Sequence, residues 1–327
     1  MQTIKFENRR LKIGFFGTPD LAASVLKALL EADEDDISLV VCQPDKPQGR
    51  KRKIIPPPVK VLALENNIEV IQPTKMRDGS LAALLRDAEL DLAIVIAYGR
   101  ILTKDTLESV RGGFWNIHTS ILPKHRGASP IHHALLDGDR ETGVTLMKMT
   151  EGCDEGPILS ISRTPIDDRE TLSSLSEKLV ALGCKLVLQS LRNVKDSGLT
   201  IVEQEHDKAS HARLLLKSDG QLDFRNQSVA LDRQVRALNP WPGSFVRLED
   251  GAALKVLEAH AVHNDVSGEL GSIVSLDEDL RIQTSQGCIA LTKVQAPGKK
   301  PMSSLDYLRG AGRHWKLGEQ LGVFPCS

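Results

Sequence analysis

The stretch "LKIGFFGTPDLAASVLKALLEA" (11–32) carries the main evidence on how the chain begins to fold. Its first seven residues are almost all apolar, as in a strand that is buried in a sheet. A turn follows, and the apolar residues of 20–32 then recur at helical spacing, which predicts an amphipathic helix. "ISLVVCQ" (37–43) reads as the next buried strand. A strand, a helix and a strand in this order favour an α/β fold.

The alternation continues along the chain. "PPVKVLALENN" (57–67) predicts a helix with proline near its first turn, "IEVIQP" (68–73) a short strand, and "GSLAALLRDAE" (79–89) another helix. "LDLAIVIA" (90–97) is almost wholly apolar, as expected of a central parallel strand that is covered on both faces. We therefore predict a doubly wound, Rossmann-like, mostly parallel sheet, whose sites open at the carboxyl ends of the strands.

The pattern changes after the predicted helix 174–194. Residues 195–221 are polar and irregular, which indicates a linker. From about residue 222 the segments are of strand length and are separated by Gly or Asp turns, which predicts a small β-barrel. We place a first domain at 1–197, a linker at 198–220 and a second domain at 221–327.

Composition limits the class of protein. The 327 residues suit two domains, and 41% of them are hydrophobic, which is enough for real cores. The net charge of −1 excludes a globally basic protein, so any nucleic-acid surface has to be a local patch. Five cysteines without close pairing favour a reducing compartment. No apolar run approaches the roughly 20 residues of a membrane helix, and we expect a cytoplasmic protein without a membrane partner.

A basic loop follows the second predicted strand. It contains Lys46, Arg50, Lys51, Arg52 and Lys53 within "QPDKPQGRKRKIIPPPVK" (43–60). A solvated charged loop is one interpretation, and an arm that holds phosphates is the other. The turn before the first helix lacks both the G-x-G-x-x-G and the Walker A pattern. Neither a dinucleotide nor a triphosphate site is indicated there, and this turn can be purely structural.

The stretch "FWNIHTSILPKHRGASPIHH" (114–133) combines a strand with a polar loop. Asn116 and His118 are two apart on the predicted strand, so both point to the same side. An amide N–H beside an imidazole pairs an oxyanion donor with a proton carrier, which suits acyl transfer. A buried Asn and His that satisfy main-chain groups remain the alternative.

A carboxylate that could complete this set is Asp154, between Gly152 and Gly156. If Asp154 faces His118, it could orient the imidazole and stabilise its cationic form. A turn-forming aspartate is the plainer interpretation. The loop histidines have no second cluster of Cys, Asp or Glu at ligand spacing, and we expect no metal site.

Together these stretches resemble the methionyl-tRNA formyltransferase family. The resemblance rests on an ordered series of motifs: "FFGTPDLAA", "QPDKPQGRKRK", "AYGRIL", "NIHTSILPKHRGASPI", "DGDRETGVTLMKMTEGCDEG", "ALNPWPGSF" and "APGKKPM". It covers nearly the whole chain from about residue 11. It implies transfer of a formyl group from 10-formyltetrahydrofolate to the free α-amino group of methionyl-initiator tRNA, which gives formylmethionyl-tRNA for translation initiation. The second domain would be an OB-like, tRNA-binding barrel.

The resemblance also implies roles for single residues. The catalytic residues would be Asn116, His118 and Asp154. The folate pocket would be formed by Tyr98, Gly99, Arg100, Ile101, Leu102, Ser120, Ile121, Leu122 and Pro123. The tRNA acceptor arm would be held by Arg50, Lys51, Arg52 and Lys53. The chain departs from the family pattern at Thr119, His125, Cys153 and Glu155, and none of these departures removes a catalytic group.

Three alternatives differ in what the sequence should contain. A formyltransferase for an amino sugar, or a hydrolase of the formyl group, should lack the basic loop and this second domain. A non-catalytic nucleic-acid-binding module would not explain Asn116, His118 and Asp154 together. A nicotinamide dehydrogenase is disfavoured because the glycine fingerprint is missing.

Overall fold

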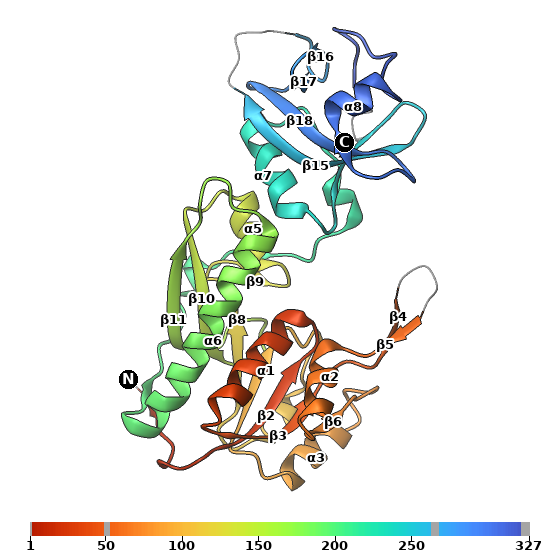
Figure 1. The fold of residues 1–327 in the computed structure, drawn as a ribbon. Helices are drawn as coiled ribbons and strands as arrows, with labels where there is room; N and C mark the ends of the chain where they lie inside the picture. Colours follow the sequence, from red (N-terminus) through yellow and green to blue (C-terminus); the bar gives the residue numbers. More distant parts are fainter. Residues whose placement is uncertain (1, 49–52, 263–267, 322–327) are drawn as a thin grey trace. The chain divides into compact units, whose positions relative to one another are not determined.

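A computed structural model describes residues 2–48, 53–262 and 268–321 of the chain (Figure 1). Its contacts divide the chain into two compact units, each assembled from segments that are not continuous in sequence. The first unit comprises Met1–Pro130, Glu141–Pro165 and Ser176–His211, and the second comprises Ile131–Arg140, Ile166–Leu175 and Ala212–Ser327. Each unit has its own sheet, as the change of pattern in the sequence predicts.

The first unit is built on a seven-stranded sheet. Across the sheet the strands are β11 (Ile158–Pro165), β10 (Glu141–Lys148), β8 (Phe114–His118), β7 (Leu92–Ile96), β2 (Lys12–Gly17), β3 (Asp36–Val41) and β6 (Glu69–Ile71). The five strands from β8 to β6 are parallel, and β10 and β11 add an antiparallel edge. This confirms the predicted doubly wound, mostly parallel sheet. The order reverses between β2 and β7, which is where such sheets open a crevice for ligands.

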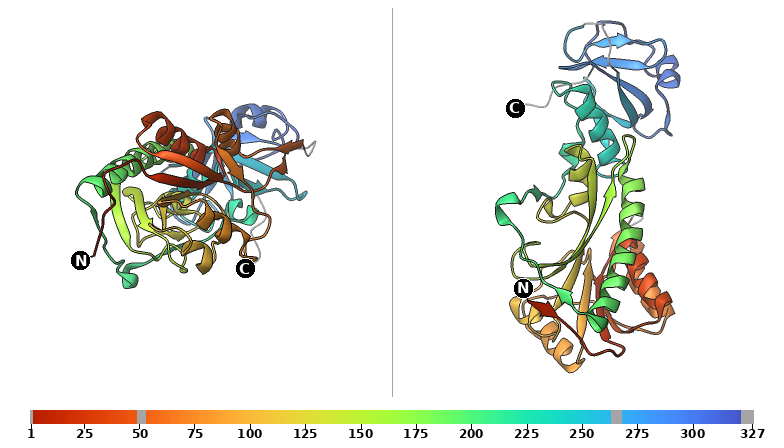
Figure 2. Two further views of the ribbon diagram at one scale, coloured as in Figure 1. Left: turned by 90° about the horizontal axis from the view of Figure 1, so that it is seen from below. Right: turned by 90° about the vertical axis from the view of Figure 1, so that its left-hand side faces the viewer.

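Helices cover both faces of this sheet (Figures 1 and 2). They are α1 (Asp20–Ala32), α2 (Pro58–Glu65), α3 (Ser80–Asp87), α4 (Lys104–Leu107) and most of α6 (Leu172–Asp196). All of α5 (Pro130–Leu136) except Pro130 belongs to the second unit. Leu85 of α3 belongs to one core cluster with Phe16, Val95 and Phe114 from three central strands. Figure 2 shows α1 and α6 together on the opposite face. Burial on both faces explains why the sequence of β7 is a continuous apolar run.

Several short elements were not predicted because they are only two to four residues long. They are β1 (Thr3–Ile4), β4 (Lys46–Gln48), β5 (Lys53–Ile55), β9 (Arg126–Gly127), β12 (Leu199–Thr200), η1 (His206–Lys208), β13 (His211–Ala212) and η2 (Lys217–Gly220). β1 pairs with β12 in antiparallel fashion. The segment after α6 is therefore anchored to the first unit from its beginning.

The second unit contains an antiparallel sheet. Its strands run in the order β14 (Ser244–Arg247), β15 (Ala253–Val262), β18 (Cys288–Gln295), β17 (Leu280–Gln283) and β16 (Ile273–Ser275), with β19 (Met302–Ser303) on β18. Irregular register between Val256 and Ala259 bends β15, as β-bulges do. The curled sheet is consistent with the predicted OB-like barrel. Two helices, α7 (Ser228–Leu238) and α8 (Ser304–Arg309), pack with it, and the sequence analysis predicted neither.

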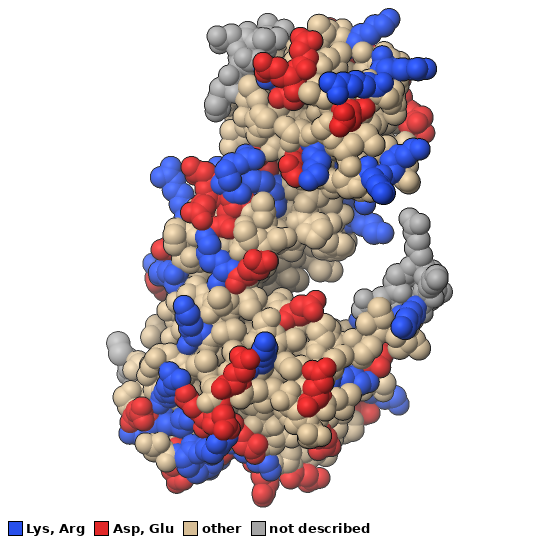
Figure 3. Space-filling model, in the orientation of Figure 1, with Lys and Arg blue, Asp and Glu red and all other residues tan. Residues whose placement is uncertain are grey.

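Charges of both signs are interspersed on the face of the first unit that Figure 3 shows. This agrees with the net charge of −1. Within the described ranges, none of the helices combines the length and the apolar character that crossing a bilayer requires.

Candidate active site

The site is built on β8, next to the central strand β7. Phe114, Asn116 and His118 alternate along β8 and therefore share one face of the sheet. Phe114 fixes this face in the core, where its ring lies 5.1 Å from that of Phe16 and 70° from parallel. Asn116 is partly exposed, whereas the side chain of His118 is 6% exposed. The apolar first half of the strand thus presents two polar side chains at its carboxyl end.

The ring of His118 is held by a main-chain group. Its Nε2 atom lies 2.9 Å from the carbonyl oxygen of His125. A carbonyl oxygen can only accept, so Nε2 carries a hydrogen and donates it. The other ring nitrogen, Nδ1, lies 3.6 Å from Oδ2 of Asp154. Nδ1 is therefore the nitrogen that is placed to exchange a proton next to the carboxylate.

Asp154 comes from the loop between β10 and β11. Its main chain adopts φ = +54°, and its side chain is 15% exposed. Oδ1 accepts a hydrogen bond of 3.4 Å from Nδ2 of Asn116, and Oδ2 accepts one of 2.9 Å from the main-chain N–H of Gly127. The structure thus brings Asn116, His118 and Asp154 together around one carboxylate.

Two contributors to this arrangement were missed by the sequence reasoning. They are main-chain groups: the carbonyl of His125 (φ = +60°) and the N–H of Gly127 (φ = +118°). The glycine at 127 was a usable signal, because a glycine allows such a backbone conformation and a close approach. Because the contact uses the carbonyl of His125, the departure of its side chain from the family pattern does not remove the anchor of the imidazole.

The segment after β7 was predicted to line a folate pocket. The carbonyl of Tyr98 accepts hydrogen bonds from Thr18 Oγ1 (3.0 Å) and Gln43 Nε2 (2.8 Å), which ties together the ends of β2, β3 and β7. The Tyr98 ring is buried in the core, and this burial raises the pKa of Tyr98 to about 12. Ile101, in contrast, is 83% exposed. The carbonyl of Tyr98 therefore lies at the strand ends and Ile101 is open to solvent, while the ring of Tyr98 is buried in the core.

The other predicted folate residues of this segment also include both exposed and buried ones. Gly99 has φ = +74° and is exposed, and Leu102 is buried. Arg100 donates to the carbonyls of Pro73 and Thr74, both at 3.1 Å.

The loop after His118 is held by hydrogen bonds within it and to β10. Ser120 Oγ donates to the carbonyl of Lys124 (2.6 Å), and Thr145 Oγ1 donates to the carbonyl of Ser120 (2.7 Å). Ser120 and Leu122 are buried, Ile121 and Pro123 are half-buried, and the Leu122–Pro123 peptide is cis. These residues therefore shape the loop, and only part of their surface is available to a ligand.

The predicted basic arm is a two-stranded hairpin of β4 and β5. Lys53 lies in β5 and is exposed, whereas Arg50, Lys51 and Arg52 lie outside the described residues. At the base of the hairpin, Asp45 pairs with Lys60 at 2.9 Å. A hydrogen bond from Gln72, followed by one from Lys60, lowers the pKa of Asp45 from its usual range. The hairpin is thereby anchored beside the strand ends.

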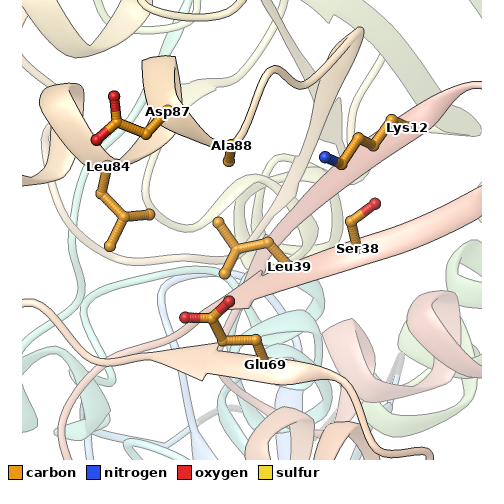
Figure 4. A pocket seen from close by; sticks show the side chains of 7 residues that line it. All are labelled: Lys12, Ser38, Leu39, Glu69, Leu84, Asp87 and Ala88. Carbon is orange, nitrogen blue, oxygen red and sulfur yellow. The ribbon is translucent and has the colours of Figure 1, made fainter.

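A cavity of about 350 Å³ lies near the amino-terminal ends of β2, β3 and β6 (Figure 4). It is lined by Lys12, Ser38, Leu39, Glu69, Leu84, Asp87 and Ala88. Since ligands of doubly wound sheets bind at the carboxyl ends, this cavity does not belong to the site around Asp154. Among the residues that the structure describes, no group of three or more His, Cys, Asp or Glu side chains is arranged to hold a metal ion.

Comparison with known proteins places the chain in a family. The formyl transferase family matches residues 11–191, and the formyl transferase C-terminal domain family matches residues 215–312. A methionyl-tRNA formyltransferase of Sorangium cellulosum is 42% identical over 311 residues, which are 94% of this chain and 98% of that protein. The chain belongs to the methionyl-tRNA formyltransferase family. A methionyl-tRNA formyltransferase of Myxococcus xanthus is likewise 42% identical, over 92% of this chain and 95% of its own length.

Membership of the methionyl-tRNA formyltransferases confirms the resemblance and the expectation of a formyltransferase enzyme. It decides against a dehydrogenase and against a non-catalytic nucleic-acid-binding module.

More distant solved structures share the fold. HypX from Aquifex aeolicus, in complex with tetrahydrofolic acid, has a TM-score of 0.63 at 18% identity and covers 97% of this chain and 50% of its own. WlaRD, a sugar 3N-formyl transferase, has the same TM-score and identity, over 89% of this chain and 100% of its own.

Proposed function

We propose that this methionyl-tRNA formyltransferase family member transfers a formyl group from 10-formyltetrahydrofolate to the free α-amino group of methionyl-initiator tRNA. The product would be formylmethionyl-tRNA for translation initiation. The observation that carries the proposal is the meeting of Asn116, His118 and Asp154 at the carboxyl end of β8, in a chain 42% identical to the relatives above. We place the reaction in the cytoplasm, where charged tRNA is used.

The folate would be held by the segments 98–102 and 120–123 and would supply the formyl group when bound. An apolar side chain that is 83% exposed at a strand end, as Ile101 is, suits a flat heterocycle that would cover it. Main-chain groups of the same segments would fix the polar edge of that ring system. The structure of HypX with tetrahydrofolic acid supports a folate partner for this fold.

Three side chains would carry out the chemistry. The carboxamide of Asn116 has two N–H groups, of which one points to Asp154 and the other would donate to the formyl oxygen. His118, when it is also protonated at Nδ1, would stabilise the same developing negative charge. The attacking amine needs no strong base, because α-amino groups titrate near about 7.7–8.0. Asp154, directly or through water, would pass the proton that the attacking nitrogen loses to the departing nitrogen.

The tRNA would be bound by both units. The basic loop with Arg50, Lys51, Arg52 and Lys53 would hold the acceptor arm through its phosphates. The second unit would add contacts through exposed cations near its end, such as Lys299 and Lys300. We propose the functional division given above: a catalytic domain at 1–197, a linker at 198–220 and a tRNA-binding domain at 221–327.

One assay tests the proposal directly. The purified chain is incubated with 10-formyltetrahydrofolate and methionyl-initiator tRNA, and formylmethionine on the tRNA is counted. Methionyl-elongator tRNA and a nucleotide-linked amino sugar serve as alternative acceptors. We expect strong preference for the initiator tRNA, and formylation of the amino sugar in its place would contradict the proposal.

A further inference from the structure

Gln204 lies in the segment after β12 and is 5% exposed. Its Nε2 atom donates to the carbonyl oxygens of Asp154 (2.9 Å) and Gly156 (2.6 Å). Its Oε1 atom accepts from Nε (3.1 Å) and Nη2 (2.7 Å) of Arg126. A carboxamide has two N–H donors and two lone pairs on its oxygen, so all four are used.

We infer that Gln204 is a positioning residue that sets the place of the Asp154 carboxylate relative to His118 and Asn116. The inference rests on the proposed function, because it concerns the same site. Gln204 itself has no free donor or acceptor for a substrate, because its buried carboxamide is fully engaged with the two loops. It binds the main chain of Asp154 on one side and the side chain of Arg126 on the other.

The two loops that Gln204 connects are the loops that define the carboxylate. One carries Asp154, and the other carries Gly127, whose N–H donates to Asp154 Oδ2. The Asp154 loop has no regular structure between Met149 and Pro157. Bonds to the carbonyls of residues 154 and 156 hold this loop on both sides of Glu155. Together with the pairing of Arg126 Nη1 and Glu155 Oε1 at 3.6 Å, Gln204 therefore holds the loop of the carboxylate against the loop of its main-chain donor.

The segment that carries Gln204 is itself fixed at both ends. Val202 and Ile158 exchange two main-chain hydrogen bonds, of 2.8 and 3.0 Å. Further on, Ser210 accepts from the main-chain N–H of His125 through Oγ (2.9 Å) and from that of Arg126 through its carbonyl (2.8 Å). Gln204 thus acts from a rigid support and not from a flexible linker.

The chemistry of the site requires a carboxamide at this position. Its two partners on the Asp154 loop are carbonyl oxygens, which need donors, whereas Arg126 needs an acceptor. A glutamate would keep the acceptor for Arg126 but would face both carbonyls without a donor. An alanine would leave buried polar groups of both loops without this partner. The glutamate variant therefore separates the hold on Asp154 from the pairing with Arg126.

The test compares Gln204→Glu and Gln204→Ala with Glu203→Ala, a change at the exposed neighbouring position. We expect kcat for formyl transfer to fall about 10- to 100-fold in both Gln204 variants, since small displacements of a catalytic group have effects of this size. KM for both substrates should change less than about two-fold. Glu203→Ala should match the wild type in both constants.

A double-mutant cycle with Asp154→Ala distinguishes positioning from a general loss of structure. If Gln204 works through Asp154, Gln204→Glu should cost almost nothing further in the Asp154→Ala background. A loss of the same size in both backgrounds would overturn the inference.

A second measurement needs no substrate. The main-chain N–H of Gly127 donates to Asp154, so its hydrogen exchange, followed by NMR, reports on the carboxylate. We expect faster exchange in Gln204→Glu and unchanged exchange in Glu203→Ala. Unchanged exchange in Gln204→Glu would overturn the inference even if the wild type formylates tRNA. A wild type without that activity would contradict only the proposed function.

Discussion

The Nδ1 atom of His118 lies 3.6 Å from the Oδ2 atom of Asp154. The opposite ring nitrogen, Nε2, donates to the carbonyl of His125. The imidazole is therefore anchored through Nε2, and Nδ1 faces the carboxylate. The same carboxylate oxygen accepts the N–H of Gly127. The contacts therefore define the position of the Asp154 carboxylate, and the importance of this group can be tested by substitution.

Asp154→Asn should lower kcat at least about 100-fold, in the range typical of a lost proton-transfer group. The variant removes the charge that faces His118. It also places an NH₂ group against one of two donors, the N–H of Gly127 or the carboxamide of Asn116. Single-turnover formylation across pH checks this, with the melting temperature as the folding control. Unchanged rates across the pH profile would refute the role of the carboxylate.

Asn116→Ala should lower kcat about 100- to 1,000-fold, which is the usual effect of removing one oxyanion donor. The fold should persist, because Asn116 is partly exposed. Folate binding should also persist, and fluorescence titration measures it. Asn66→Ala, at an exposed asparagine that ends α2, is the matched control. Near-normal turnover of Asn116→Ala would contradict its assignment as a donor.

Replacing Arg50, Lys51, Arg52 and Lys53 by serine should weaken tRNA binding and leave folate binding intact. The log–log salt dependence of tRNA affinity should flatten by about 0.7 to 0.9 for each phosphate that the loop no longer neutralises. A control with the same change in charge replaces exposed cations of α1, α3, α4 and α6, namely Lys27, Arg86, Lys104 and Lys185. If folate affinity drops while tRNA affinity and its salt slope stay constant, the loop covers the small substrate instead.

The exposed cations near the end of the second unit should add to tRNA affinity. Serine at Lys299, Lys300, Arg313 and Lys316 should weaken binding and reduce the salt slope, as in the preceding experiment. Substitution is a sharper test than a chain that ends near residue 205. Such a chain would also lose Ser210, which binds the main chain of His125 and Arg126. Equal affinity of the variant and the wild type would show that the second unit has another purpose.

Asp91→Asn should lower the free energy of unfolding at pH 7 by about 1–3 kcal/mol. It should also make this free energy less dependent on pH in the acid range. Hydrogen bonds from Arg9 are the main reason why the pKa of Asp91 is lowered from its usual range, and Arg111 also pairs with it at 2.7 Å. A lowered pKa in the folded state contributes stability above the unfolded value of about 3.9. This contribution disappears as the pH falls through the folded pKa. Urea denaturation at pH 7 and below pH 4 measures the free energy of unfolding of the wild type and the variant. If the variant loses the same free energy of unfolding at both pH values, this explanation is contradicted.

The sheet and the two polar residues of β8 could be predicted because their signals are local. Apolar runs mark the buried strands, and a spacing of two places Asn116 and His118 on one side. α7 was missed because its eleven residues lie among segments of strand length.

The contacts of Gln204 could not be predicted. Its partners Arg126 and Asp154 are 78 and 50 positions away in the sequence. A polar side chain in a polar stretch gives no local sign that it will be buried, because burial here depends on partners that only the folded chain supplies.

His118 and Asp154, the two side chains that form the 3.6 Å contact and that we propose to be catalytic, differ in how their surroundings tolerate mutation. The anchor of His118 is a carbonyl, which every amino acid possesses, so exchange of the side chain at position 125 does not delete it. The main chain of Asp154, in contrast, is held by the carboxamide of Gln204, which a single base change can replace by glutamate. Outside the three residues that we propose to be catalytic, loss-of-function substitutions should therefore concentrate at Gln204 and its partner Arg126, and substitutions of His125 should be tolerated.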